Sequence, residues 1–211
     1  MNAALAFSLL RSLDVPAFTT ADARALFGGT EPAASQTLAA LTRQSLVVPL
    51  RRGLWTLDAN IDPLLLPEWL SAPAPSYVSL LTALYRHGVI EQIPAVVYAV
   101  TLGKTKRDET NVGNYSLHRV APEIFGGFEI AKNGVKLATA EKALVDVAYL
   151  SGTKGRLFAA LPEIEVPRGF SVAEVRWWVK RIPSARHRVV SNAWLARHVM
   201  ARRRTQNRGA R

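Results

Sequence analysis

The 211-residue sequence contains no cysteine and only four histidines. Because there is no thiol, the chain forms no disulfide, ligates no zinc or iron–sulfur cluster through cysteine, and has no cysteine nucleophile. The histidines, at positions 87, 118, 187 and 198, are scattered and do not have the spacing of metal ligands. We therefore expect neither a metal nor a cofactor.

Long apolar segments are absent too. The longest one, Ile93–Leu102, contains a proline and is far shorter than the roughly 18 residues that a membrane-spanning helix requires. Residues Met1–Leu10 are apolar but lack the basic region that opens a signal peptide. With 49% hydrophobic and 20% charged residues, the composition is typical of one large or two small globular domains. We expect a soluble cytoplasmic protein that does not contact membranes.

Sequence motifs for catalysis are also missing. The glycine-containing turns at 126–127 and 152–155 lack the spacing of phosphate-binding loops, and there is no Gly-x-Ser-x-Gly motif. Glu129, Glu141 and Lys142 are residue types that metal-dependent nucleases use. However, Glu141 and Lys142 are consecutive on a predicted helix and so point in different directions. We interpret Glu141 and Asp146 as structural residues and expect no enzymatic activity.

The chain does have an excess of positive charge, and it lies near the C-terminus. The net charge is +11, yet residues 1–167 contain 15 Lys or Arg and 15 Asp or Glu. Residues 168–211 contain 12 Lys or Arg and one acid. Such a segment attracts polyanions, including nucleic acid. We predict that Arg202, Arg203 and Arg204 contact DNA; the alternative is that the tail is only solvated.

The first 58 residues predict three helices followed by a hairpin. The helices extend from Ala3 to Ser12, from a Thr19 cap to about Phe27, and from a Thr30 cap to about Gln44. The third helix buries Ala34, Leu38, Leu41 and Ser45 at helical spacing. Two β-prone segments, 46–50 and 54–57, then flank a glycine turn. This order of elements is typical of a winged helix-turn-helix.

A winged helix-turn-helix reads DNA with its third helix and its hairpin. Small residues on that helix allow close approach to the major groove, and Gln36 can pair with an adenine edge. Arg51 and Arg52 at the hairpin tip can reach phosphates or the minor groove. The predicted contacts in this domain are Thr20, Ala33, Ser35, Gln36, Thr37, Arg43, Arg51 and Arg52. The alternative is a domain of this fold that docks protein rather than DNA.

The remainder predicts a second domain of mixed type. The fold class is α+β: a winged helix-turn-helix (1–58), a proline-rich, extended connection (59–76), a mixed α+β domain (77–201) and a basic helical tail (202–211). The predicted elements are a helix over 77–87, strands over 96–101 and 115–120 around a charged loop at 104–109, a hairpin of 128–130 and 135–137, a helix over 140–150 capped by Thr139, a helix opened by a Ser171–Glu174 capping box, and a helix over 185–203 with Val189, Ala193, Ala196 and Met200 on one face.

One segment of this second domain resembles a known family. Tyr77–Pro94, with the sequence YVSLLTALYRHGVIEQIP, is similar to the helix and turn of the AbiE-type antitoxins. The strands at 96–101 and 117–120, and the segment ATAEKALVD at 138–146, continue the same pattern in the same order. The Arg-Arg-Gly-Leu-Trp hairpin also matches, so the resemblance covers about residues 5–150.

The resemblance implies the antitoxin of a type IV toxin–antitoxin system, which acts in abortive infection and phage defence. The N-terminal domain would bind inverted repeats in double-stranded DNA upstream of its own operon and repress it, a form of autoregulation. The second domain would counteract a nucleotidyltransferase-like toxin without a stable complex. Two alternatives remain open. One is a plain winged-helix regulator whose second domain senses a ligand or dimerises, and the other is a DNA-acting enzyme.

Overall fold

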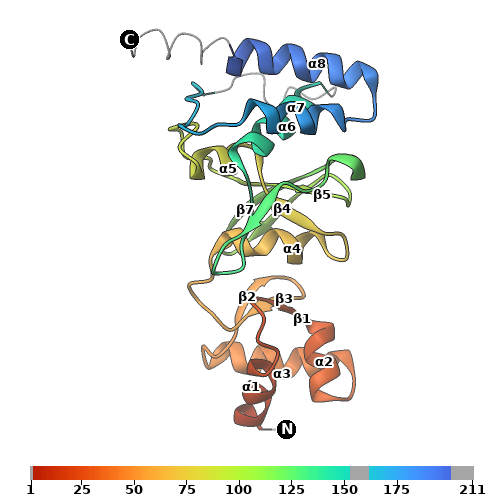
Figure 1. The fold of residues 1–211 in the computed structure, drawn as a ribbon. Coiled ribbons are helices and arrows are strands. Elements are labelled where there is room, and N and C mark those ends of the chain that lie inside the picture. The colour runs from red at the N-terminus through yellow and green to blue at the C-terminus, as the bar shows by residue number, and fades with distance from the viewer. Residues whose placement is uncertain (1, 153–161, 201–211) are drawn as a thin grey trace.

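The computed structural model describes residues 2–152 and 162–200 and shows an α+β protein with two units stacked end to end (Figure 1). The first unit contains α1 (Ala3–Arg11), β1 (Phe18–Thr19), α2 (Thr20–Phe27), α3 (Glu31–Arg43), β2 (Val48–Arg51) and β3 (Leu54–Thr56). Its three strands form an antiparallel sheet in the order β1-β3-β2. The three predicted helices and the predicted hairpin are therefore confirmed, and β1 adds a third strand.

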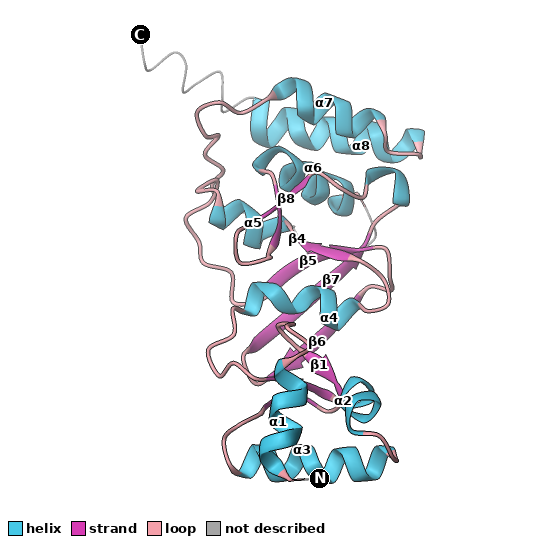
Figure 2. Ribbon diagram, turned by 60° about the horizontal axis from the view of Figure 1, so that its bottom comes forward, coloured by secondary structure: helices cyan, strands magenta, loops and turns pink. Residues whose placement is uncertain are grey.

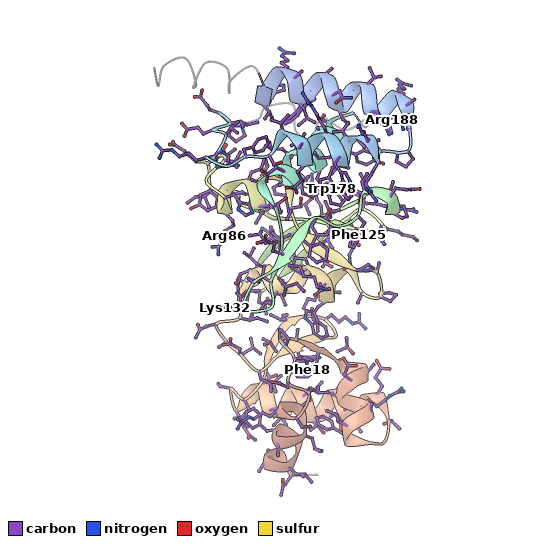
Figure 3. All side chains as sticks on the ribbon, in the orientation of Figure 1. Phe18, Arg86, Phe125, Lys132, Trp178 and Arg188 are labelled. Atoms are coloured by element: carbon purple, nitrogen blue, oxygen red, sulfur yellow. The ribbon has the colours of Figure 1, made fainter. Side chains whose placement is uncertain are left out.

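Local hydrogen bonds explain where the helices of the first unit begin. The Thr19 side chain accepts from the Asp22 amide and the Asp22 carboxylate accepts from the Thr19 amide, which is a reciprocal cap of α2. Thr30 caps α3 in the same way, without the return bond. Phe18 lies at the centre of this unit, in a core shared with Leu38 and Leu41 (Figure 3).

The second unit contains η1 (Pro63–Leu65), α4 (Leu66–Ser71), β4 (Ser76–Val78), α5 (Leu80–Arg86), β5 (Val97–Thr101), β6 (Lys106–Thr110), β7 (Gly113–Arg119), η2 (Pro122–Ile124), β8 (Phe128–Ile130), β9 (Lys136–Ala138), α6 (Ala140–Ser151), α7 (Val172–Lys180), α8 (Ala185–Leu195) and the π-helical turn η3 (Ala196–Met200). Its strands form a mixed six-stranded sheet in the order β6-β7-β5-β4-β9-β8. The β5–β7 and β4–β9 pairs are parallel. Figure 2 shows α4 against one face of this sheet and α6, α7 and α8 beyond the other.

Two apolar cores hold these layers together. On one face of the large sheet, Leu66 and Leu70 of α4 pack with Tyr115 and Leu117 of β7, and Leu50 of the hairpin belongs to the same cluster. This cluster therefore joins the two units. On the other face, α5, α6, α7 and α8 share the largest core of the chain.

Three predicted elements differ from the structure. Residues 59–76 do not form an extended connection, because Asp62 caps η1 and Pro67 occupies the first turn of α4. The helix predicted from Tyr77 begins at Leu80, and Ser76–Val78 is a strand that pairs with both β5 and β9. The predicted charged loop at 104–109 is largely β6, an edge strand that leaves its charged residues exposed or half-buried.

Two further details of the helices differ as well. Ser45, predicted to be buried, is exposed and left-handed with φ 58° just after α3. Along α8 and η3 the buried residues are Ser191, Leu195 and Val199, whereas Val189 is 68% exposed. The predicted apolar face of this helix therefore points outward. None of the helices in the described ranges is long and apolar enough to cross a membrane.

Candidate nucleic-acid interface

Helix α3 separates an apolar side from a polar side. Ala34, Leu38 and Leu41 are at most 1% exposed and fix the buried side. Because α-helical residues advance by about 100° each, Gln36 and Arg43 point away from that core, and both are exposed. The small residues between them are Ala39, exposed, and Ala40, half-buried. The result is a shallow polar stripe that can approach a flat or grooved partner closely.

The other predicted residues of α3 flank this stripe. Ala33 and Ser35 are exposed, at the start of the helix. Thr37 is half-buried, and its hydroxyl donates to the carbonyl of Ala33 at 3.0 Å. Its hydroxyl oxygen can still accept, so Thr37 can contact a donor only at the edge of the stripe.

Thr20 is buried rather than presented to a partner. It is 9% exposed, and its hydroxyl accepts from the indole nitrogen of Trp55 at 3.0 Å. Its amide donates to the carbonyl of Gly53 in the hairpin turn. Thr20 therefore fixes the hairpin against α2, and its predicted role as a direct contact is replaced by a positioning role.

The two arginines of the hairpin differ in their surroundings. Arg52 is exposed at the tip, beside Gly53, whose φ of 78° allows the tight turn. Arg51 instead lies beside β6, where its Nε is 3.7 Å from a carboxylate oxygen of Asp108. That carboxylate also accepts from the ammonium of Lys106 at 3.2 Å. Arg52 is thus the hairpin cation that is free to meet a phosphate, while Arg51 contributes to the joint between the units.

Backbone bonds strengthen this joint. The Asn111 amide donates to the carbonyl of Leu50 at 2.8 Å, and its side chain donates to the carbonyl of Pro49 at 2.9 Å. The turn between β6 and β7 is therefore hydrogen-bonded to β2. The hairpin is thus bonded directly to the second unit.

A second group of polar side chains is buried in the core shared by α5, α6, α7 and α8. Lys142 and Asp146 form an ion pair one turn apart on α6, and neither has exposed surface. Tyr77 and Ser79 donate to the carboxylate of Asp146 at 3.0 and 2.7 Å. Lys142 donates to the Tyr77 hydroxyl at 2.8 Å. From the sequence we predict a structural role for Asp146 and consider Lys142 only as a nuclease residue type, and we do not predict the roles of Tyr77 and Ser79. The local signal for the pair is the Lys–Asp spacing of four residues.

An aromatic ring and a glycine turn pack against this buried cluster. The ammonium of Lys142 is 5.0 Å from the ring centroid of Trp178, which lies on the inner side of α7 (Figure 3). A Cβ at Gly127 would lie 2.6 Å from Trp178 and 2.9 Å from Lys142, so only glycine fits there. Leu80, next to Ser79, adopts a left-handed φ of 56°, a strained conformation for leucine.

Burial dominates the electrostatics of the cluster. It raises the pKa of Asp146 and of the Tyr77 hydroxyl, and it lowers the pKa of Lys142. The attraction between Lys142 and Asp146 acts in the opposite direction on both groups. These contacts connect α6 to β4 and α7.

A cavity of about 340 Å³ lies at the N-terminal end of α6, lined by His87, Glu129, Glu141, Arg168 and neighbouring residues. Its size is at the low end for small-ligand sites. Glu141 is already engaged, since its carboxylate accepts from the Ser171 amide at 2.6 Å. Glu141 thereby takes the place predicted for Glu174, whose carboxylate accepts from Thr139 instead. Lys142 faces the core, so the nuclease residue types are not brought together.

The remaining predicted contacts, Arg202, Arg203 and Arg204, lie outside the described residues. Within residues 2–152 and 162–200 no group of three or more His, Asp or Glu side chains could hold a metal ion. No protein-family model matches the sequence. No curated protein matches it with significant similarity.

Proposed function

We propose that this protein is a cytoplasmic DNA-binding antitoxin of the AbiE type. In this proposal it binds inverted repeats upstream of its own operon through a winged helix-turn-helix and represses transcription. It also counteracts a nucleotidyltransferase-like toxin without forming a stable complex with it, and it is not an enzyme.

The observation that carries the DNA-binding part is the polar stripe of α3. Gln36 has the amide that pairs with an adenine edge, and Arg43, about two turns further along, can reach a phosphate or a guanine. Both point away from a core that fixes the helix firmly. The element order of the first unit, three helices with a three-stranded antiparallel sheet, supports the winged helix-turn-helix part of the proposal.

Arg52 supports the same proposal from the hairpin. It is an exposed cation at a tip that Thr20, Trp55 and Asn111 hold in place. A cation presented on a rigid element loses little conformational freedom on binding a phosphate. Antitoxicity, by contrast, is supported only by the resemblance of Tyr77–Pro94 and the segments that follow it.

A gel-shift experiment tests the DNA-binding part. The probe is the promoter region directly upstream of the protein's own reading frame, competed with DNA of scrambled sequence. Gln36→Ala should lose about 1–3 kcal/mol of discrimination between the two, because the adenine contact is removed. Gln92→Ala changes an exposed glutamine of the second unit and should behave like the wild type. Equal binding of both DNAs by the wild-type protein would contradict the proposal.

A growth experiment tests the antitoxin part. The neighbouring gene is induced from one plasmid and this protein is supplied from a second. Restored growth supports antitoxicity, and rescue by the Gln36→Ala protein would show that neutralisation does not need sequence-specific DNA binding. If the neighbouring gene is toxic and growth is not restored, the protein is a DNA-binding regulator whose second unit has another role.

A further inference from the structure

Helix α7 carries an exposed face that the proposed function does not use. Val175, Trp178 and Val179 are buried and attach the helix to α6. The opposite side presents four exposed residues: Arg176, Trp177, Lys180 and, directly after the helix, Arg181. They occupy positions i, i+1, i+4 and i+5 and therefore form one stripe.

The aromatic residue of this stripe is unusual for its exposure. Trp177 is 49% exposed, although tryptophan normally buries most of its surface. The guanidinium carbon of Arg181 lies 3.7 Å from the centroid of its ring, so the cation lies over one face of the indole. Trp177 also meets the buried Trp178 at 87°, with the ring centroids 4.7 Å apart, and this contact anchors it. The Trp177–Arg181 pair, called the stack below, is thus an exposed aromatic and cationic element of the surface.

Most of the charged residues around the stack are positive. Residues 166–200 contain seven Lys or Arg and a single acid, Glu174. The carboxylate of Glu174 is turned toward Thr139, from which it accepts a hydrogen bond at 3.0 Å. Among the described residues, Arg176, Lys180 and Arg181 have no acidic partner within salt-bridge distance.

The following helix extends the positive surface. A short turn leads from Arg181 to α8, where Arg186 is exposed in the first turn, and Arg197 is exposed in η3, which follows α8. Arg188 is different, because its guanidinium donates to the carbonyls of Ile182 and Pro183 and closes the end of α7. Helices α7 and α8 lie at the end of the molecule opposite α3 (Figure 1).

Cations alone would suit any polyanion, but the exposed stack is more selective. Bases of a duplex are stacked on each other and offer their edges, whereas unpaired bases can stack on tryptophan or on a guanidinium plane. Cations one helical turn apart can contact the phosphates beside such a base. We propose that the α7 stripe, formed by Arg176, Trp177, Lys180 and Arg181, binds single-stranded nucleic acid, with Trp177 as the stacking platform.

This site is independent of the duplex interface proposed for α3, since the two lie at opposite ends of the molecule. An acidic protein segment would also satisfy the cations. It would not account for the stacked indole, which is why single-stranded nucleic acid is the favoured ligand.

The test measures binding of the full-length protein to a fluorescently labelled single-stranded DNA of mixed sequence that cannot pair with itself. Trp177→Ala should weaken binding about tenfold, because one base loses its stacking partner. Trp177→Phe keeps an aromatic face and should retain most of the affinity. The double variant Arg176→Ala/Lys180→Ala should lower the slope of log affinity against log salt by about 1.4, the value for two phosphates of a single strand.

Matched controls separate this site from general electrostatics. Lys104→Ala/Lys132→Ala removes two exposed lysines of the same unit and should change neither the affinity nor the salt slope beyond error. Gln36→Ala should bind the single strand like the wild type, so failure of the α3 proposal does not affect this result. Circular dichroism of each variant verifies that it folds.

Three outcomes would overturn the proposal. The first is single-strand affinity that Trp177→Ala leaves unchanged. The second is an equal loss of affinity for a duplex of the same sequence, which would make α7 a duplex contact. The third is tighter binding of a labelled polyglutamate peptide, lost in Trp177→Ala, which would assign the stripe to an acidic protein.

Discussion

The two units differ in whether they bury charged side chains. In the first unit no described charged side chain is buried, and the buried polar residues are only Thr20 and Thr56. The second unit buries a complete ion pair, Lys142 and Asp146, together with His118 and several hydroxyl groups. Residue type alone therefore does not locate a site. Among the described residues, the Lys142–Asp146 cluster is buried, whereas Gln36 and Arg43 on α3 are exposed.

Breaking the buried pair gives the largest expected effect. Asp146→Ala leaves the Lys142 ammonium buried without its partner, which should lower the free energy of unfolding by about 3–5 kcal/mol. Urea unfolding followed by circular dichroism measures this loss. The double variant Lys142→Met/Asp146→Leu removes both charges and should be clearly more stable than Asp146→Ala. If the double variant is as unstable as the single one, packing rather than charge explains the loss.

A pH experiment sharpens the comparison, because all four histidines belong to the second unit. Burial, and then the charge of Arg107, lowers the pKa of His118 to about 4, whereas an unfolded histidine has a pKa of about 6.5. Between these values the unfolded chain binds a proton that the folded chain does not. Stability should therefore fall as the pH drops from 6.5 toward 4, by about 3 kcal/mol in total.

The His118→Gln variant isolates this contribution. It cannot bind the proton, so its free energy of unfolding should depend less steeply on pH over the same window. Unfolding in urea at several pH values between 4 and 7 measures both slopes. Equal slopes for the variant and the wild type would assign the pH dependence to other groups.

Removing a cation from the first unit should have a smaller effect, and one confined to binding. Arg52→Ala should leave stability unchanged, because the side chain is exposed. It should weaken binding to all duplex sequences alike and reduce the salt slope by about 0.9, the value for one phosphate contact. Gel shifts at several salt concentrations measure both. A loss restricted to one DNA sequence would mean that Arg52 reads bases instead of phosphate.

The parts of the fold that sequence reasoning predicted are those set by neighbours along the chain. Thr19 with Asp22 and Thr139 before α6 are caps whose partners lie three residues away, and both helices begin where predicted. The sequence predicts helix from Tyr77, and so over two residues of the strand Ser76–Val78, because Val78 fits a helical period with Leu81 and Leu84. The pairing of this strand with β5 and β9 depends on segments more than 20 residues away, which no local pattern reveals.

The contrast between local patterns and long-range packing also explains which residues of the candidate site were predicted correctly. The stripe on α3 follows from helical spacing, so Gln36 and Arg43 were found correctly as exposed residues. The burial of Thr20 depends on Trp55, which is 35 residues away. The environment of Arg51 likewise depends on Asp108 in another strand. Long-range packing thus buries Thr20 and places an acidic partner beside Arg51, and neither effect is visible in the local sequence.

The contact between Arg51 and Asp108 is where the two units meet, and changing it gives the smallest expected effect on stability. Its atoms are 3.7 Å apart and the Arg51 side chain is 37% exposed, so Asp108→Asn should alter the free energy of unfolding by less than about 1 kcal/mol. The same change removes a negative charge beside the hairpin and releases Arg51 toward solvent. Duplex DNA should therefore bind more tightly at low salt, and the gain should vanish as added salt screens the charge. Weaker or unchanged binding at low salt would show that Arg51 serves only to join the units.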